Sequence, residues 1–206
     1  MKSQHAITWK FKRWLDLSLA FIGLMVSSPL FILISILIRL DSPGPVFFRQ
    51  ERVGQNGQIF RVWKFRTMVC NAEFIGPCYS FIENDPRITW VGKVLRYLSL
   101  DELPQLFNII KGEMSLVGPR ATLPYQAERY NDFQKKRLAV KPGITGWAQI
   151  NGRNDIPWSQ RFIYDVWYVE HWSLMLDLKI IFSTIPMVLR RQGVRMNQNV
   201  TEVEDF

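Results

Sequence analysis

The chain is poor in cysteine, with only Cys70 and Cys78 among its 206 residues. Two thiols are too few for a disulfide framework, and they lack the neighbouring ligands of a zinc site. We therefore expect ordinary thiols in a reducing, cytoplasm-facing domain. The sequence also lacks a Walker loop, a dinucleotide fingerprint, an internal repeat and a linker between two domains. These absences argue against the standard nucleotide folds and predict one core.

Positive charge and large aromatic side chains are what the sequence has in quantity. Its formal net charge is +8, its pI is about 9.7, and it holds eight tryptophans and fourteen phenylalanines. The charge indicates an anionic partner: nucleic acid, an acidic membrane surface or a phosphorylated substrate. Aromatic rings beside basic residues suit a membrane–water interface, and they also stack on nucleic-acid bases.

Residues 17–38 form one long apolar run, which as a helix is about 33 Å long and exceeds the roughly 30 Å of a hydrocarbon core. No small-residue cleavage site follows it, so we expect no cleaved signal peptide. Basic residues flank both ends, and the positive-inside rule keeps such residues on the cytoplasmic face. Ser28 and Pro29 lie near the middle, where proline removes a backbone donor and bends a helix. A helix that breaks there and returns fits both features, but proline kinks also occur in true spans, so both placements stay open.

Two adjacent carboxylates, Asp101 and Glu102, lie at a predicted helix start in Ser99-Leu-Asp-Glu-Leu-Pro-Gln105. A glycine-proline-arginine turn ending at Arg120 follows. Carboxylates beside bases indicate a phosphate site, in which a cation holds the anion while one acid attacks or moves a proton. The same stretch fits a capping box, with Ser99 and Glu102 capping a helix. Spacing alone favours capping, although that interpretation leaves Asp101 without a task.

Further basic residues precede this motif. The runs 46–53 and 59–65 predict a β-hairpin, because Asn56-Gly57 lies between them. The alternation at its end places Lys64 and Arg66 on one face, where two cations can meet a phosphate. Arg96 lies five residues before Asp101. For each of these three cations taken alone, a solvated surface is the simpler interpretation.

The rest of the chain reads as mostly helical. Helical periodicity covers 88–98, 103–110 and 121–138, and two amphipathic helices suited to core packing or to a bilayer surface cover 158–172 and 174–191. Residues 141–146 read as a turn-rich loop. After it, Asn151 and Arg153 are candidates for binding a nucleotide or phosphate.

Several motifs together resemble the bacterial sugar transferase family, the monotopic polyprenyl-phosphate phosphoglycosyl transferases, in their minimal single-domain form. The resemblance covers about residues 10–195. Its pieces, in order, are Ser28-Pro29, Arg52-Val-Gly54, Lys64-Phe-Arg-Thr-Met68, Asp85-Pro-Arg87, Leu95-Arg96, Ser99–Gln105, Ser115-Leu-Val-Gly-Pro-Arg120, Pro142-Gly-Ile-Thr-Gly146 and Gln149-Ile-Asn-Gly-Arg153.

The resemblance implies an α+β fold: a membrane-embedded re-entrant helix-break-helix, and a small, mostly helical cytosolic domain with a short β-hairpin and interfacial amphipathic helices. We expect residues 1–40 to form the basic N-terminus and membrane helix, 41–193 the catalytic domain and 194–206 a C-terminal tail. The family also implies the inner membrane of a bacterium, with the domain on its cytoplasmic face.

The implied reaction passes a sugar 1-phosphate from a UDP-sugar to undecaprenyl phosphate and releases UMP. By resemblance Asp101 attacks the phosphorus nearest the sugar and forms a covalent phosphosugar intermediate, while Glu102 deprotonates the lipid phosphate or orients a metal. Mg²⁺ near Asp101 would neutralise the diphosphate. The expected phosphate-binding residues are Lys64, Arg66, Arg96, Arg120, Asn151 and Arg153.

One departure and two rival functions complete the sequence-based interpretation. Members often read Gly-Pro-Arg-Pro where this chain has Ala121 after Arg120, and we expect activity to survive because the arginine is kept. A basic nucleic-acid-binding protein would explain the charge, but the sequence holds no recognised module for it. A membrane-anchored scaffold without chemistry is the second rival.

Overall fold

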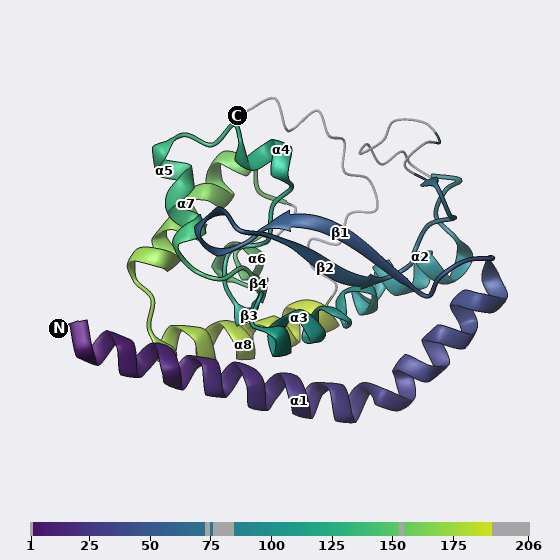
Figure 1. The fold of residues 1–206 in the computed structure, drawn as a ribbon, viewed down its shortest axis with the longest axis horizontal. Helices are drawn as coiled ribbons and strands as arrows, with labels where there is room; N and C mark the ends of the chain where they lie inside the picture. The colour runs from purple at the N-terminus through teal and green to yellow at the C-terminus, as the bar shows by residue number, and fades with distance from the viewer. Residues whose placement is uncertain (1, 73–74, 76–84, 153–154, 191–206) are drawn as a thin grey trace.

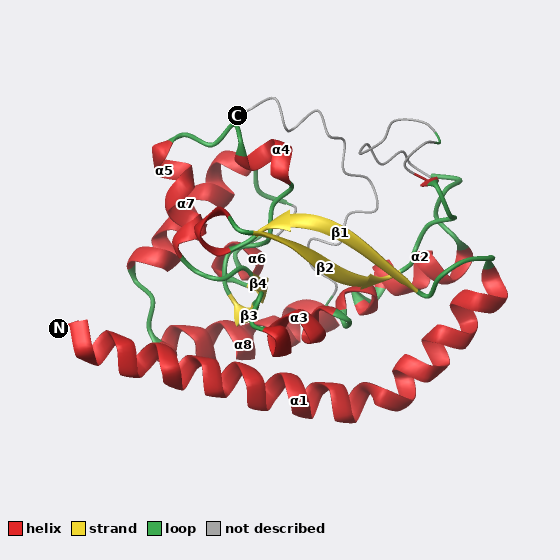
Figure 2. Cartoon of the chain, viewed as in Figure 1, coloured by secondary structure: helices red, strands yellow, loops and turns green. Residues whose placement is uncertain are grey.

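The computed structural model describes residues 2–72, 75, 85–152 and 155–190. It is a mixed α+β fold, as expected, in which one long apolar helix lies along a mostly helical domain with two small sheets. Figure 1 and Figure 2 show this helix, α1 (Lys2–Asp41), following one side of the domain, while a β-hairpin crosses the middle and α4 lies on the far side.

α1 is bent and unbroken, so the predicted helix-break-helix is wrong in its break. Pro29 lies inside it and has no backbone N–H to donate to the carbonyl of Met25, four residues earlier. The hydroxyl of Ser28 donates to that same carbonyl at 2.8 Å, and the hydroxyl of Ser27 donates to the carbonyl of Gly23 at 2.6 Å. Because Ser28 satisfies the carbonyl that Pro29 leaves without its usual donor, the helix continues past the proline, and Figure 1 shows α1 bent along its length.

One stripe of α1 packs on the domain and the opposite stripe is bare. Ala20, Ile34 and Ile38 are buried and belong to two clusters of the core. The exposed stripe is almost wholly apolar and includes Phe11, Trp14, Phe21, Ile22, Met25, Val26, Ile32, Leu33, Ile36 and Leu40. By length and composition, Thr8–Asp41 is the candidate membrane helix among the described residues.

The predicted hairpin is confirmed. β1 (Phe47–Val53) pairs antiparallel with β2 (Ile59–Phe65), and Val53 lies opposite Ile59. The connection contains the short helix η1 (Gln55–Gly57), in which Asn56 and Gly57 both have positive φ. The buried Asn108 covers the free edge of β2, since its side chain accepts from the amide of Trp63 and donates to the carbonyl of Arg61.

The predicted helices after the hairpin are confirmed as α2 (Trp90–Tyr97) and α3 (Gln105–Lys111), which ends at Gly112 with φ +88°. Between them lies η3 (Leu100–Glu102). A second sheet was not predicted: β3 (Ser115–Val117) pairs in parallel with β4 (Gly143–Thr145). The loop expected at 141–146 therefore contains a strand.

The continuous helix predicted over 121–138 is wrong. This segment is divided into α4 (Pro124–Ala127), α5 (Asp132–Lys135) and η4 (Lys136–Ala139). α6 (Trp147–Ile150) follows β4, and the two predicted amphipathic helices are confirmed as α7 (Trp158–Glu170) and α8 (Leu174–Leu189). The expected tail 194–206 lies outside the described residues.

Polar contacts attach both ends of α1 to the same domain. Near its start, Lys12 pairs with Asp177 of α8 at 2.5 Å, and the carboxylate of Asp16 accepts from Ser115 and from the amide of Leu116. At its end, the carboxylate of Asp41 accepts from the amide of Val91 in α2. The first contacts are buried, so they fix α1 along the domain rather than away from it.

Candidate active site

Asp101 and Glu102 stand on η3, a single turn between α2 and α3. Ser99 precedes this turn with φ +55°, a left-handed conformation that is uncommon for a residue other than glycine. Its side chain makes no capping hydrogen bond to the turn, so the capping-box interpretation of Ser99 and Glu102 is wrong. The turn redirects the chain so that both carboxylates reach the end of β2.

Glu102 is held between two cations. Its Oε1 lies 2.7 Å from Lys64 Nζ and 2.6 Å from an Nη of Arg120, and the second Nη of Arg120 donates to Oε2 at 3.3 Å. Burial alone would raise the pKa of Glu102. Arg120 and Lys64 outweigh burial and hold that pKa well below its ordinary value. Glu102 is therefore ionised and a weak base.

Asp101 has a different environment. Its one ion pair among the described residues is with Lys64, at 3.9 Å, and its side chain is 14% exposed. Burial, helped by the neighbouring charge of Glu102, raises the pKa of Asp101 above its ordinary value although Lys64 opposes the shift. Two adjacent carboxylates thus differ: Glu102 is saturated by cations, and Asp101 keeps its oxygens available.

Arg96 reaches the same site from α2. Its Nε donates to Thr67 Oγ1 at 2.8 Å, and its charge acts on Asp101. α2 lies close to the end of β2 because Gly92 has no side chain: a Cβ there would meet the carbonyl oxygen of Thr67 at 2.1 Å. The sequence therefore places a glycine where helix and strand must touch.

Arg52 is a further cation of this site that we did not single out from the sequence. From β1 it donates to the carbonyl of Ala121 at 3.2 Å and to Gln50 at 2.6 Å. Burial, together with the charge of Arg120, lowers the pKa of Arg52 to about 10, and Glu102 acts in the opposite direction. The one sequence signal for Arg52 was its place in the motif Arg52-Val-Gly54.

Two predicted binding residues, Arg66 and Asn151, are not brought to the carboxylates. Arg66 is buried and donates to the carbonyls of Ile38, Ser42 and Pro43, so it binds the end of α1. Asn151 is exposed and donates to the carbonyl of Trp147 in α6. Arg153 lies outside the described residues.

A buried network supports Arg120 from behind. Arg137 pairs with Asp165 of α7 at 2.6 Å, donates to the hydroxyl of Tyr130 at 2.6 Å and donates to the backbone carbonyl of Arg120 at 3.0 Å. Arg137 and Asp165 are both at most 3% exposed. The network fixes the backbone from which Arg120 extends to Glu102.

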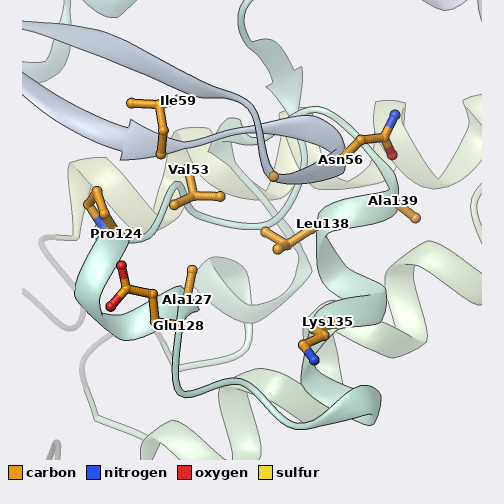
Figure 3. Close-up of a pocket in the computed structure, with 10 residues that line it drawn as sticks. Val53, Asn56, Ile59, Pro124, Ala127, Glu128, Lys135, Leu138 and Ala139 are labelled. Carbon is orange, nitrogen blue, oxygen red and sulfur yellow. The ribbon is translucent and has the colours of Figure 1, made fainter.

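One cavity lies near the hairpin tip, between the hairpin, α4 and η4. It has a volume of about 530 Å³ and a mostly apolar lining. Figure 3 shows Val53 and Ile59 of the hairpin near Pro124 of α4, with Leu138 from η4 beside them. A much smaller hollow shares Val53 and Leu138 with it and is also lined by Pro119 and Arg120. The carboxylates themselves do not line either cavity, so the chemistry is placed by the ionic cluster and not by the cavity volume.

Comparison with known proteins assigns the chain. The family described as bacterial sugar transferase matches residues 7–191. The chain is 45% identical to the uncharacterized sugar transferase EpsL of Bacillus subtilis over 190 residues, which cover 92% of this chain and 93% of that one. It is 45% identical to the exopolysaccharide production protein ExoY of Rhizobium meliloti over 196 residues, 88% of this chain and 87% of that one.

A longer relative extends the comparison. The undecaprenyl-phosphate galactose phosphotransferase of Salmonella typhimurium is 42% identical over 196 residues, 88% of this chain and 41% of that protein. The chain belongs to the bacterial sugar transferase family, and the resemblance found in its motifs is confirmed. Its extent matches the shorter relatives, EpsL and ExoY.

Proposed function

We propose that this protein transfers a sugar 1-phosphate from a UDP-sugar to undecaprenyl phosphate, releases UMP and so begins the assembly of a glycan. The observation that carries the proposal is the unequal carboxylate pair, with Asp101 available and Glu102 saturated, inside a cluster of cations. The name of the Salmonella relative supports undecaprenyl phosphate as the acceptor.

Asp101 is the nucleophile in this proposal. One of its carboxylate oxygens attacks the phosphorus next to the sugar, the bond from that phosphorus to the bridging oxygen breaks, and UMP leaves with the electron pair. An oxygen of the lipid phosphate then attacks the same phosphorus and releases Asp101. The raised pKa of Asp101 supports this role, because a more basic carboxylate is a better nucleophile once it is ionised.

Glu102 orients the cations rather than accepting a proton. Its pKa lies well below the ordinary value, which makes it a poor base at neutral pH. It holds Lys64 and Arg120 against the site, where these two cations stabilise charge on the transferred phosphoryl group.

The residues present fit a magnesium ion that is shared with the substrate. The described residues contain no group of three His, Cys, Asp or Glu side chains that could hold a metal alone. Mg²⁺ is commonly bound by one or two carboxylates together with substrate phosphates. Only one carboxylate oxygen of Asp101 lies in an ion pair among the described residues, which leaves the other for a metal ion. When bound, the ion would neutralise charge on the diphosphate.

We propose that the domain lies on the cytoplasmic face of the inner membrane and that α1 enters the bilayer from that face and returns. Both ends of α1 are attached to one domain, through Lys12 and Asp16 at the start and Asp41 at the end. A spanning helix would have to release one of these ends. The bare apolar stripe between them then contacts lipid, and the basic flanks stay on one face.

The transfer reaction is tested by UMP release from detergent-solubilised protein supplied with Mg²⁺, undecaprenyl phosphate and one UDP-sugar at a time. We expect release with at least one donor, and none from Asp101→Asn. Intact-mass analysis without acceptor should find one phosphosugar adduct in the wild type, mapped to Asp101. An adduct on another residue would contradict the assignment of the nucleophile.

The membrane placement is tested by tags at Met1 and at Phe206 in cells. Both tags should report from the cytoplasm. If they report from opposite faces, α1 spans the bilayer and the attachments of its two ends do not persist in the membrane.

A further inference from the structure

Arg52 makes no direct ion pair with a carboxylate among the described residues, although the charge of Glu102 acts on it. Its two hydrogen bonds go to neutral acceptors, the carbonyl of Ala121 and the amide oxygen of Gln50. A guanidinium has five N–H donors, so several remain for a ligand. The charge of Arg120 lies near enough to Arg52 to lower the pKa of Arg52.

The site as a whole has a surplus of positive charge. Three cations, Lys64, Arg52 and Arg120, lie around the carboxylates Asp101 and Glu102, and a fourth, Arg96, is influenced by both Asp101 and Asp85. Two like charges held close together in a half-buried position are costly unless an anion lies between them. The diphosphate of a sugar nucleotide would supply such an anion.

The cations reach the site from different elements. Arg96 comes from α2, whose outer surface exposes Trp90, Val94 and Tyr97, and α2 packs against α1. This is the side from which a lipid would arrive. Arg52 instead donates to Ala121, next to Arg120 and the hollow that adjoins the 530 Å³ cavity. That cavity borders α4, on the side of the domain away from α1 (Figure 1).

We propose that Arg52, together with Arg120, binds the phosphate of the leaving nucleotide, and that Arg52 therefore serves the donor and not the lipid acceptor. This inference rests on the proposed function. The guanidinium of Arg52 bridges the backbone of Ala121 to an oxygen of that phosphate, so the nucleoside extends toward the cavity. The two half-reactions then use arginines from different elements.

The test uses Arg52→Gln, with Arg61→Gln as the matched control. Arg61 lies on the partner strand, is exposed and pairs with Glu51 across the hairpin, so the control removes the same charge outside the site. Arg52→Lys is the conservative variant, because it keeps the charge and loses the planar guanidinium.

Adduct formation is measured without lipid, at UDP-sugar concentrations below saturation. Discharge of the preformed adduct is measured with undecaprenyl phosphate. For Arg52→Gln we expect adduct formation to slow about 10- to 100-fold, the range for one charge-assisted hydrogen bond, with discharge unchanged. Arg52→Lys should recover part of the loss, and Arg61→Gln should match the wild type.

A merely structural role would displace Ala121 and Arg120 and slow both half-reactions, which would overturn the proposal. Unchanged adduct formation would overturn it as well. UMP binding, measured by calorimetry without any turnover, separates this inference from the proposed function. If the wild type forms no adduct but binds UMP, and Arg52→Gln weakens that binding about 10-fold or more, the transfer reaction is wrong and the nucleotide site stands.

Discussion

Asp177 of α8 is one of the carboxylates that hold the start of α1 on the domain, and its removal gives a quantitative prediction. Asp177 of α8 is 1% exposed and accepts hydrogen bonds from three side chains: Lys12 of α1 at 2.5 Å, Tyr168 of α7 at 2.7 Å and Trp172 at 3.1 Å. Asp177→Leu would leave the buried ammonium group of Lys12 without its ion-pair partner.

Breaking a buried ion pair on one side costs about 3–5 kcal/mol, whereas an exposed pair contributes about 0–1 kcal/mol. For a chain of this length, each kcal/mol moves the unfolding midpoint by about 2–4 °C. We therefore expect Asp177→Leu to lower the midpoint by about 6–20 °C. The double variant Lys12→Met with Asp177→Leu should recover most of this loss, because no unpaired charge remains.

The assay is thermal unfolding in detergent, followed by tryptophan fluorescence. Lys136→Gln is the control, since Lys136 and Glu170 form a pair of which both members are about half exposed. The reasoning is refuted if Asp177→Leu shifts the midpoint no more than Lys136→Gln does. It is also refuted if the double variant is less stable than Asp177→Leu alone.

Three further predictions follow from single contacts. Gly92→Ala should lower the unfolding midpoint and the transfer rate, because the added Cβ meets the carbonyl oxygen of Thr67. Gly23→Ala in α1 is the control: its Cβ makes only an ordinary contact, so the change should be neutral or stabilising. Thermal unfolding and transfer rates of the two variants measure both effects. Arg66→Gln should lower the midpoint by releasing the end of α1 while the KM for the donor stays unchanged, and a raised KM with an unchanged midpoint would restore the predicted phosphate-binding role. Because the folded-state pKa of Asp101 is raised, its ionisation costs stability as pH rises through that pKa. Asp101→Asn should therefore be more stable than the wild type at pH 7–8, and the difference should vanish below about pH 3.9, where both states are protonated. Thermal unfolding at a series of pH values measures this difference.

Elements with strong local signals could be predicted from the sequence. The hairpin follows from two β-rich runs around Asn56-Gly57, and α3 follows from apolar spacing that ends at Gly112. β3 and β4 could not be found in this way. Each has three residues, too few for a pattern, and their pairing depends on a close backbone approach: a Cβ on Gly118 would meet the carbonyl oxygen of Lys141 at 2.3 Å.

The candidate site was predictable in its carboxylates and only partly in its cations. The motif around Asp101 and Glu102 is continuous in sequence, whereas the cations come from separate elements. Alternation along a strand predicts that Lys64 and Arg66 lie on one face and share a role. In the structure Lys64 pairs with Glu102, whereas Arg66 binds the end of α1. Arg52 joins the site only because the end of β1 pairs with the segment after Arg120: Val53 bridges Thr122, which brings Arg52 to Ala121.

The contacts of Arg66 show how the apolar helix α1 and the site are joined. Arg66 binds three backbone carbonyls at the end of α1, and the next residue, Thr67, accepts the hydrogen bond from Arg96, whose charge acts on Asp101. Consecutive residues of one chain segment therefore hold the end of the apolar helix and a cation of the site. Because α1 is also attached at its start, the distance of Asp101 from the apolar stripe is set by the fold itself. The proposed reaction between a soluble nucleotide and a lipid phosphate needs such a fixed distance, since both substrates must reach the same carboxylate.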